Sequence, residues 1–389
     1  MYSIIHSLSG YLWGFPMIAL LFCTHIFMTT KTGLIQRKTL KGVKLSLKTQ
    51  EGGSGELSPF AALSTTLAST LGTGNIIGVG TAVAMGGAGA VFWCWLTGVL
   101  GMATQYGEVL LSVKYRTKDL SGNFTGGPMY VLRDGVGSKL LGGVYAAVAA
   151  ASLLITGSVV QSGSVVAVTK DVFSGKDMYF FVGGQSFSLV AALTGAVLGI
   201  LTALTVFSSI SSLGGICQVM VPFMAAVYIL ASLLILIINR DFLGESLALI
   251  LREAFSLRAA GAGLLSSSIM LSARYGVARG LFSNEAGLGT SSIVSASSKE
   301  ENPVRQALVS MTATFWDTVV MCAVTGVVIV SSLLALSKEG EMVWAEGETM
   351  CYIAFSRIPY IGKGILVFSL LVFAFSTIIG LSCVGAKCA

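Results

Sequence analysis

Gly72–Gly80 reads GTGNIIGVG and lies inside an apolar segment that runs from about Ser58 to Met85. Four glycines among these nine residues disfavour a straight helix, because each costs about 1 kcal/mol relative to alanine. A break within lipid frees backbone N–H and C=O groups, so it is tolerated only where it lines a cavity. The freed N–H groups can then hold an anion and the freed carbonyls a cation. The spacing equally allows a glycine face that packs closely against another helix.

The composition indicates a polytopic helical membrane protein. Of 389 residues, 54% are hydrophobic and only 11% are charged, whereas soluble domains carry about 25% charged residues. The net charge of +6 requires no nucleic-acid partner, because basic loops on the cytoplasmic side of a membrane protein explain it. Seven cysteines without a CxxC pair and only two histidines favour neither a disulfide framework nor a metal cofactor.

Nine apolar segments predict about nine membrane helices in one transmembrane domain, residues 1–389, because about 20 apolar residues cross a bilayer. The segments lie near residues 11–30, 58–86, 89–113, 141–168, 186–208, 214–238, 262–290, 306–336 and 361–384. The first has no Lys or Arg before it and a basic run after it, which favours an uncleaved helix over a signal peptide.

Loop charges predict the orientation of these segments. Loops on one side carry 14 basic and six acidic residues, and loops on the other side carry eight basic and nine acidic residues. The more basic side is predicted to be cytoplasmic. The chain is then a multi-pass protein of the cell membrane with its N-terminus outside.

A second stretch, Arg279–Ser292, interrupts the seventh segment with glycines and hydroxyl residues: RGLFSNEAGLGTSS. It follows the first candidate break by five segments. Interruptions in corresponding positions of two halves are a sequence pointer to a transporter binding site. The pair of stretches therefore predicts two broken helices that meet around one site.

Polar side chains inside the apolar segments are further candidates, because such residues usually face a cavity or a partner. The ionisable ones are Glu108, Arg274, Arg279, Glu285 and Asp317. The amide of Gln161 can reach a polar ligand or bond to a neighbouring helix. The hydroxyls of Ser376 and Thr377 can bond back to the preceding turn, or act as hard oxygen donors for sodium.

Several motifs resemble the alanine or glycine:cation symporter family. They are GTGNIIGV in the first stretch, FWCWLTGVLGMATQYGE at 92–108, GGPMY at 126–130, RGLFSNEAGLG at 279–289, FWDT at 315–318 and AFSTIIG at 374–380. The resemblance covers nearly the whole chain, and RGLFSNEAGLG is highly specific. It implies an all-α, leucine-transporter-like fold of two inverted five-helix repeats. The helix near 11–30 would be extra, the first repeat would cover about 58–238, and the second would begin near 262.

The resemblance also implies sodium-coupled import of small neutral amino acids, alanine and glycine, by alternating access and without a cofactor. The implied substrate contacts are the backbone amides of Gly72, Thr73 and Gly74, and the side chains of Asn75, Gln161, Phe282, Ser283 and Asn284. The implied sodium ligands are Thr70, Asn75, Ser376 and Thr377. The preference between alanine and glycine, acceptance of D-amino acids, ion stoichiometry and oligomeric state are left open.

Two departures from the family pattern qualify this reading. Leu381 stands where the family usually has a tryptophan that would cap the substrate pocket, and SCVGAKC follows at 382–388. The chain stops at Ala389, where the family has about two more helices, so the second repeat is predicted to be incomplete and the C-terminus truncated. A truncated, non-transporting membrane fragment is therefore one alternative function.

A proton-coupled amino-acid transporter is the other alternative, because Glu285 and Asp317 are carboxylates within apolar segments. An enzyme is disfavoured, since no nucleophile–base pair or metal cluster occurs in the apolar segments.

Overall fold

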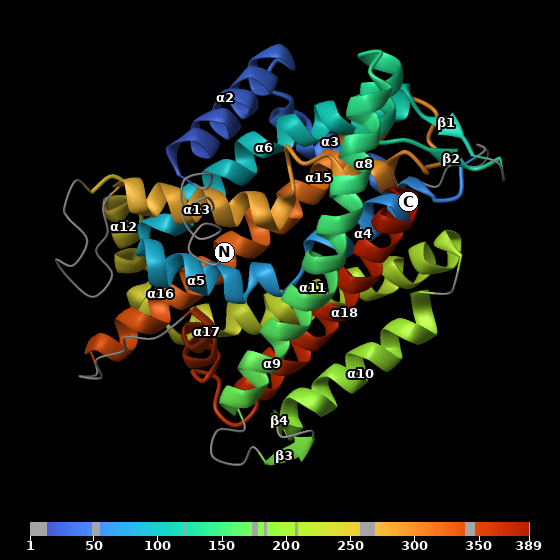
Figure 1. Cartoon of the computed structure of the whole chain (residues 1–389). Coiled ribbons are helices and arrows are strands. Elements are labelled where there is room, and N and C mark those ends of the chain that lie inside the picture. Colours follow the sequence, from blue (N-terminus) through green and yellow to red (C-terminus); the bar gives the residue numbers. More distant parts are fainter. Residues whose placement is uncertain are drawn as a thin grey trace.

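The computed structural model describes residues 14–48, 55–119, 122–172, 178–182, 185–206, 209–256, 269–338 and 347–388. These residues form a bundle of helices with two short hairpins in its connections (Figure 1). A broken helix, α4–α5, runs across the middle of the bundle, and the helix formed by α8 and α9 crosses it (Figure 1).

The first broken helix begins and ends for local reasons. α4 (Pro59–Thr70) starts behind Ser58, whose Oγ accepts the N–H of Ala61 at 3.0 Å. Leu71 and Gly72 then leave the helix, and a 3₁₀ turn at Thr73–Asn75 leads into α5 (Ile77–Gly86). The two halves are bent by 63°. The predicted break is confirmed, and glycine also allows close packing in this stretch, since a Cβ on Gly80 would overlap the backbone of Gly347.

The second broken helix consists of α13 (Ile269–Asn284) and α14 (Thr290–Ser295). Between them the chain is left-handed at Glu285, Gly287 and Gly289, with φ of 55°, 108° and 78°. Glycine adopts this region without a Cβ clash, which explains why the two glycines redirect the chain here. The second predicted break is confirmed; residues 262–268 of that segment lie outside the described residues.

The remaining helices follow the other predicted segments and add short ones between them. They are α2 (Phe15–Lys31), α3 (Thr39–Ser46), α6 (Gly89–Lys114), α7 (Pro128–Tyr130), α8 (Lys139–Leu154), α9 (Gln161–Val172), α10 (Leu189–Val206), α11 (Ile210–Ile238), α12 (Leu243–Ala254), α15 (Pro303–Thr314), α16 (Ala323–Lys338), α17 (Gly347–Phe355) and α18 (Gly362–Cys388). π-Helical segments at Ile155–Val160 and Phe315–Cys322 join α8 to α9 and α15 to α16. Such segments are rare and occur often at functional sites.

Two antiparallel hairpins lie in the connections. β1 (Thr117–Lys118) pairs with β2 (Phe124–Thr125), and β3 (Tyr179–Val182) pairs with β4 (Gln185–Ser188). The helix predicted for 186–208 therefore starts only at Leu189, because the residues before it belong to β4.

Among the described residues, four helices are long and apolar enough to cross a membrane, and two bent pairs raise this number to six. The other three predicted segments form α6, α10 and α13. α10 is short, and α6 carries polar residues such as Thr97 and Gln105 that are completely buried in the bundle. A helix that is buried among other helices can carry more polar residues than one that contacts lipid. Its mean hydropathy can therefore fall below the value that identifies a membrane-spanning helix.

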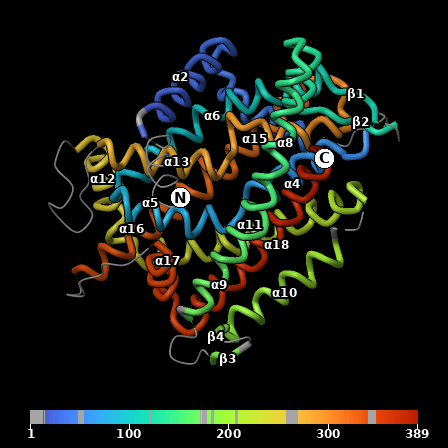
Figure 2. Tube along the Cα trace, in the orientation of Figure 1, coloured from blue at the N-terminus to red at the C-terminus, as the bar shows by residue number. Residues whose placement is uncertain are grey.

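α18 lies directly against the first break. A Cβ on Gly380 would overlap the backbone of Ser69, so α18 and the last turn of α4 are in backbone contact. Two turns earlier in α18, the Phe373 ring lies 5.7 Å from the ring of Tyr228 in α11. Figure 2 shows the three helices, α4, α11 and α18, near one another although they are distant in sequence.

Candidate functional site

Three side chains, one of them from the break itself, satisfy backbone groups that the first break frees. The Asn75 Oδ1 accepts the N–H of Gly72 at 2.9 Å. The Gln161 Oε1 accepts both the N–H and the hydroxyl of Thr73, at 3.1 and 2.8 Å. The Thr377 hydroxyl lies 3.1 Å from the carbonyl oxygen of Leu71 and donates to it. The first residue of α9, Gln161, and Thr377 of α18 thus bond to nearby residues of the broken backbone.

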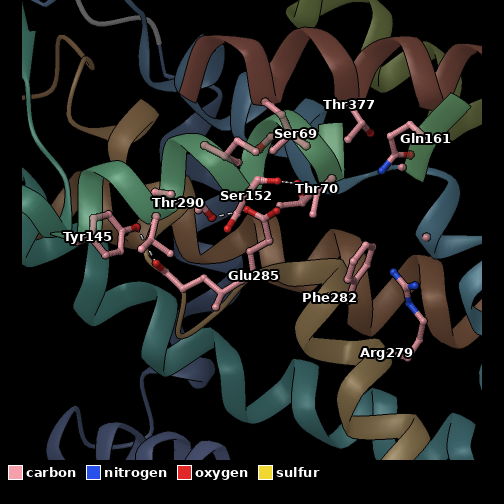
Figure 3. A pocket seen from close by; sticks show the side chains of 18 of the residues that line it. Ser69, Thr70, Tyr145, Ser152, Gln161, Arg279, Phe282, Glu285, Thr290 and Thr377 are labelled. Atoms are coloured by element: carbon pink, nitrogen blue, oxygen red, sulfur yellow. Dashed lines mark hydrogen bonds between the residues drawn. The ribbon is translucent and has the colours of Figure 1, made fainter. Parts of the chain in front are cut away.

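A cavity of about 430 Å³ opens next to these groups. We call it the inner cavity, because its far end is formed by the first turns of α8, which follow a predicted cytoplasmic loop. Figure 3 shows Gln161 and Thr377 at one end of this cavity and Tyr145 at the other. Its polar lining at the break is Ser69, Thr70, Gly72, Gln161 and Thr377.

A second cavity of about 460 Å³ lies on the other side of the break. We call it the outer cavity; its lining includes Thr73, Ile77, Thr81, Ser164, Tyr275 and Glu348. Gly74, Arg279 and Phe282 line both cavities, and we call these three residues the septum. The two broken helices therefore meet where two cavities are separated by a single layer of residues.

Most of the predicted site residues border one of these cavities. Gly72, Thr70, Gln161 and Thr377 line the inner cavity, Thr73 lines the outer one, and Gly74 and Phe282 line both. Asn75, Ser283, Asn284 and Ser376 do not line either cavity and are at most 2% exposed.

Three of those four residues form a hydrogen-bonded network behind the break. The Asn75 Nδ2 donates to the Asp317 carboxylate at 2.7 Å and to the Ser283 hydroxyl at 2.9 Å. Ser283 and Thr318 donate to the other oxygen of that carboxylate at 2.8 and 2.6 Å, and Asn284 donates to Thr318 at 3.0 Å. In this conformation these residues join the two broken helices and line neither cavity, and the substrate contacts predicted for Asn75, Ser283 and Asn284 stay predictions.

The predicted sodium ligands also include residues that line a cavity and residues that do not. The hydroxyls of Thr70 and Thr377 lie at the end of α4, whereas the Asn75 oxygen is already engaged by Gly72. The Ser376 hydroxyl is buried and has no hydrogen-bond partner, which is unusual because nearly all buried polar groups are paired. Hard oxygen donors at the end of a broken helix fit a monovalent cation, and the unpaired hydroxyl belongs to the residue that precedes Thr377.

The second break is held by carboxylates. The Glu108 carboxylate, from α6, accepts the N–H of Gly287 at 2.9 Å, and the Thr290 hydroxyl donates to Glu285. The Tyr145 hydroxyl donates to the carbonyl of Leu288 at 2.7 Å and so ties α8 to the same break. The role of Tyr145 had no sequence signal, because one aromatic residue in an apolar helix is unremarkable.

Arg279 is a charged residue within an apolar segment. Its position in an apolar segment marked it as a candidate, but no site role was predicted for it. It lies in the septum, and its guanidinium stacks 4.7 Å from the ring centre of Phe282.

Comparison with known proteins agrees with this geometry. Residues 1–389, the whole chain, match the model of the sodium:alanine symporter family. The chain belongs to this family. Like other members, it is a membrane transporter of the amino-acid:cation type.

Three curated relatives place the chain within the family. It is 39% identical to the sodium/alanine symporter AgcS of Methanococcus maripaludis, with 99% of this chain and 82% of the relative aligned. It is 32% identical to a putative sodium/proton-dependent alanine carrier protein, YrbD, of Bacillus subtilis, over 97% of this chain and 76% of the relative. It is 31% identical to the probable sodium/glutamine symporter GlnT of the same organism, over 82% and 64%.

Proposed function

We propose that this protein imports small neutral amino acids, alanine and glycine, together with sodium by alternating access. The observation that carries the proposal is the pair of cavities that meet at the two breaks and are separated only by the septum. Opening one cavity while the other closes would expose one central site to each side of the membrane in turn.

The hydrogen bonds of Gln161 suggest where the substrate binds. Its Oε1 takes two bonds from Thr73, and a substrate carboxylate could replace it on the freed N–H groups at Gly72–Gly74. The space is small: a Cβ on Gly72 would lie 2.7 Å from the Thr377 hydroxyl and 2.9 Å from Gln161 Oε1. Such tight surroundings favour a short amino acid whose carboxylate lies against backbone.

Sodium would bind beside this site, between α4 and α18. The hydroxyls of Thr70, Ser376 and Thr377 would be its ligands, together with carbonyls from the end of α4. Binding there would hold α18 against the last turn of α4 and stabilise the break, so that substrate and sodium favour the same closed conformation. The printed name of AgcS, a sodium/alanine symporter, supports this pairing of substrate and ion.

The repeat organisation and orientation belong to the same proposal. The two breaks would be the first helices of two inverted repeats, about 58–238 and from about 262 onward, in the cell membrane with the N-terminus outside.

Uptake into proteoliposomes tests the proposal. We expect labelled alanine to accumulate with an inward sodium gradient and not with choline in place of sodium. Gln161→Ala should lower the initial rate at least about 10-fold, because it removes a polar group at the substrate end of the cavity. Gln218→Ala is the matched control, since Gln218 bonds to Ser58 at 3.1 Å and lines neither cavity.

The same assay separates the alternatives. Accumulation driven by a pH gradient without sodium would favour proton coupling, for which the buried carboxylate of Asp317 and the cavity-lining Glu285 are candidates. A folded protein that moves no alanine under either gradient would favour the non-transporting alternative.

A further inference from the structure

The Arg279 guanidinium occupies an unusual position in the septum. It borders both cavities, and Figure 3 shows it beside Phe282 and facing the side of the break that carries Gln161. Gly74 and Gly78 of the first broken helix form its seat, because a Cβ on either residue would overlap the guanidinium nitrogens. The charge is therefore held against bare backbone, between two spaces large enough for a small ligand.

Among the described residues this charge has no ion-pair partner, although the Asp317 carboxylate is near enough to interact with it electrostatically. Within the described part of the chain, no carboxylate forms an ion pair with Arg279, and its Nε and Nη2 are buried without a hydrogen-bond partner. Asp317, a buried carboxylate behind the break, is already bonded to Asn75, Ser283 and Thr318. A buried, unpaired charge is strongly unfavourable unless an anion is supplied to it. The guanidinium is thus a fork of donors without a planar acceptor, which is the partner that arginine binds best.

The lining of the outer cavity contains polar and acidic groups in addition to the Arg279 cation. Among the described residues, this lining carries one carboxylate, Glu348 of α17, together with the hydroxyls of Thr73, Thr81 and Ser164. A cavity with one cation, one carboxylate and several hydroxyls matches a zwitterion in both charge and polarity. Its volume of about 460 Å³ exceeds what alanine needs.

We propose that the outer cavity is a second binding site for zwitterionic amino acids, in which Arg279 binds the carboxylate and Glu348 binds the ammonium group. This inference rests on the proposed function, since it assigns the same substrate to a second place on its path. The site lies on the predicted extracellular side of the septum, so an amino acid held there is one layer from the first break. Its guanidinium also repels cationic amino acids such as lysine, so the site selects by charge before the close surroundings of Gly72 select by size.

Equilibrium binding of labelled alanine to the purified full-length protein in detergent, at saturating sodium, tests the inference. We expect two alanines per chain in the wild type and one in Arg279→Gln and in Glu348→Gln. Arg279→Lys should retain the second site with an affinity lowered about 10-fold, because an ammonium cannot form the two-pronged contact. Gln161→Ala should lose the inner site and retain the outer one. Arg274→Gln is the matched control, since Arg274 lies on α13 but lines neither cavity, and it should bind two.

Each outcome decides between the two proposals. Unchanged stoichiometry in Arg279→Gln would overturn the outer site. If that variant does not fold, unchanged stoichiometry in Glu348→Gln together with an unchanged affinity in Arg279→Lys would overturn it. A wild type that binds one alanine, with Gln161→Ala binding none, would also overturn the outer site and leave the proposed function intact. No alanine bound by any folded variant would overturn the proposed function and, with it, the outer site.

Discussion

Gly78 lies where the guanidinium of Arg279 crosses the first broken helix. A Cβ there would overlap Nη1 of Arg279, and the guanidinium is wedged between this backbone and the ring of Phe282. We expect Gly78→Ala to lower the free energy of unfolding by about 1–3 kcal/mol through overpacking. Thermal unfolding in detergent measures this.

The control for that substitution is Gly195→Ala, because Gly195 lies inside α10 and a Cβ there would meet nothing within 4 Å. Alanine should be neutral or stabilise this helix by up to about 1 kcal/mol. Equal melting temperatures for the two variants would show that Gly78 is not the seat of the guanidinium.

Leu381 determines how much of the inner cavity is filled at the α18 wall. It lines the cavity, and its Cβ would lie 3.3 Å from a Cβ placed on Gly157 in the first π-helical segment. Leu381→Trp should fill part of this space and lower uptake of a long neutral amino acid such as glutamine about 10-fold relative to alanine. Competition of unlabelled amino acids against labelled alanine measures the change. Leu193→Trp, at a position of α10 that is 60% exposed, should leave the ratio unaltered; a decrease in both variants would contradict the assignment.

At the scale of elements, the network around Asp317 joins the two broken helices to the second π-helical segment. Asn75 donates to one oxygen of the carboxylate and Ser283 to the other, at 2.7 and 2.8 Å. Asp317→Asn places an amide where Asn75 also presents one, so two donors face each other. We expect about 1–3 kcal/mol of lost stability and slow transport, because the helices can no longer move as one unit.

Exchanging the two residues tests whether this contact is direct. In Asn75→Asp combined with Asp317→Asn, the amide and carboxylate trade places while the Gly72 N–H keeps an acceptor. The double variant should regain at least about half of the stability that either single substitution loses, as expected for coupled neighbours. Unfolding and uptake measured across the four-member cycle give the coupling. Additive losses would contradict the network.

The two breaks could be predicted from sequence because their cause is local. Gly72–Gly80 and Gly287–Gly289 are poor helix formers wherever they occur, and the structure breaks at both. The direction of each side chain could not be predicted, because helical periodicity is lost at a bend. It therefore no longer indicates which side chains point into a cavity. Asn75 therefore lies behind the break, although it is adjacent to cavity-lining Gly74.

Other parts of the fold depend on tertiary contacts. α12 and α17 were not predicted, because they are 12 and 9 residues long and neither is a run of apolar residues sufficient for a span. The π-helical segments have no distinctive amino-acid composition, so the sequence does not predict them. The septum arises from α13 packing against α5, which joins residues about 200 positions apart.

At the scale of the whole molecule, alternating access predicts that the two cavities change accessibility in opposite directions. Ser152 lines the inner cavity and Ser164 the outer one, so a cysteine at either position reports on one side. The background is Cys23→Ser, which removes an exposed thiol of α2. With a membrane-impermeant thiol reagent, Ser164→Cys should react in right-side-out vesicles and Ser152→Cys in inverted ones. Sodium with alanine should change the two labelling rates in opposite senses, because one septum cannot open to both sides at once. Rates that rise together would indicate a continuous channel, and labelling from the reversed sides would place the N-terminus inside.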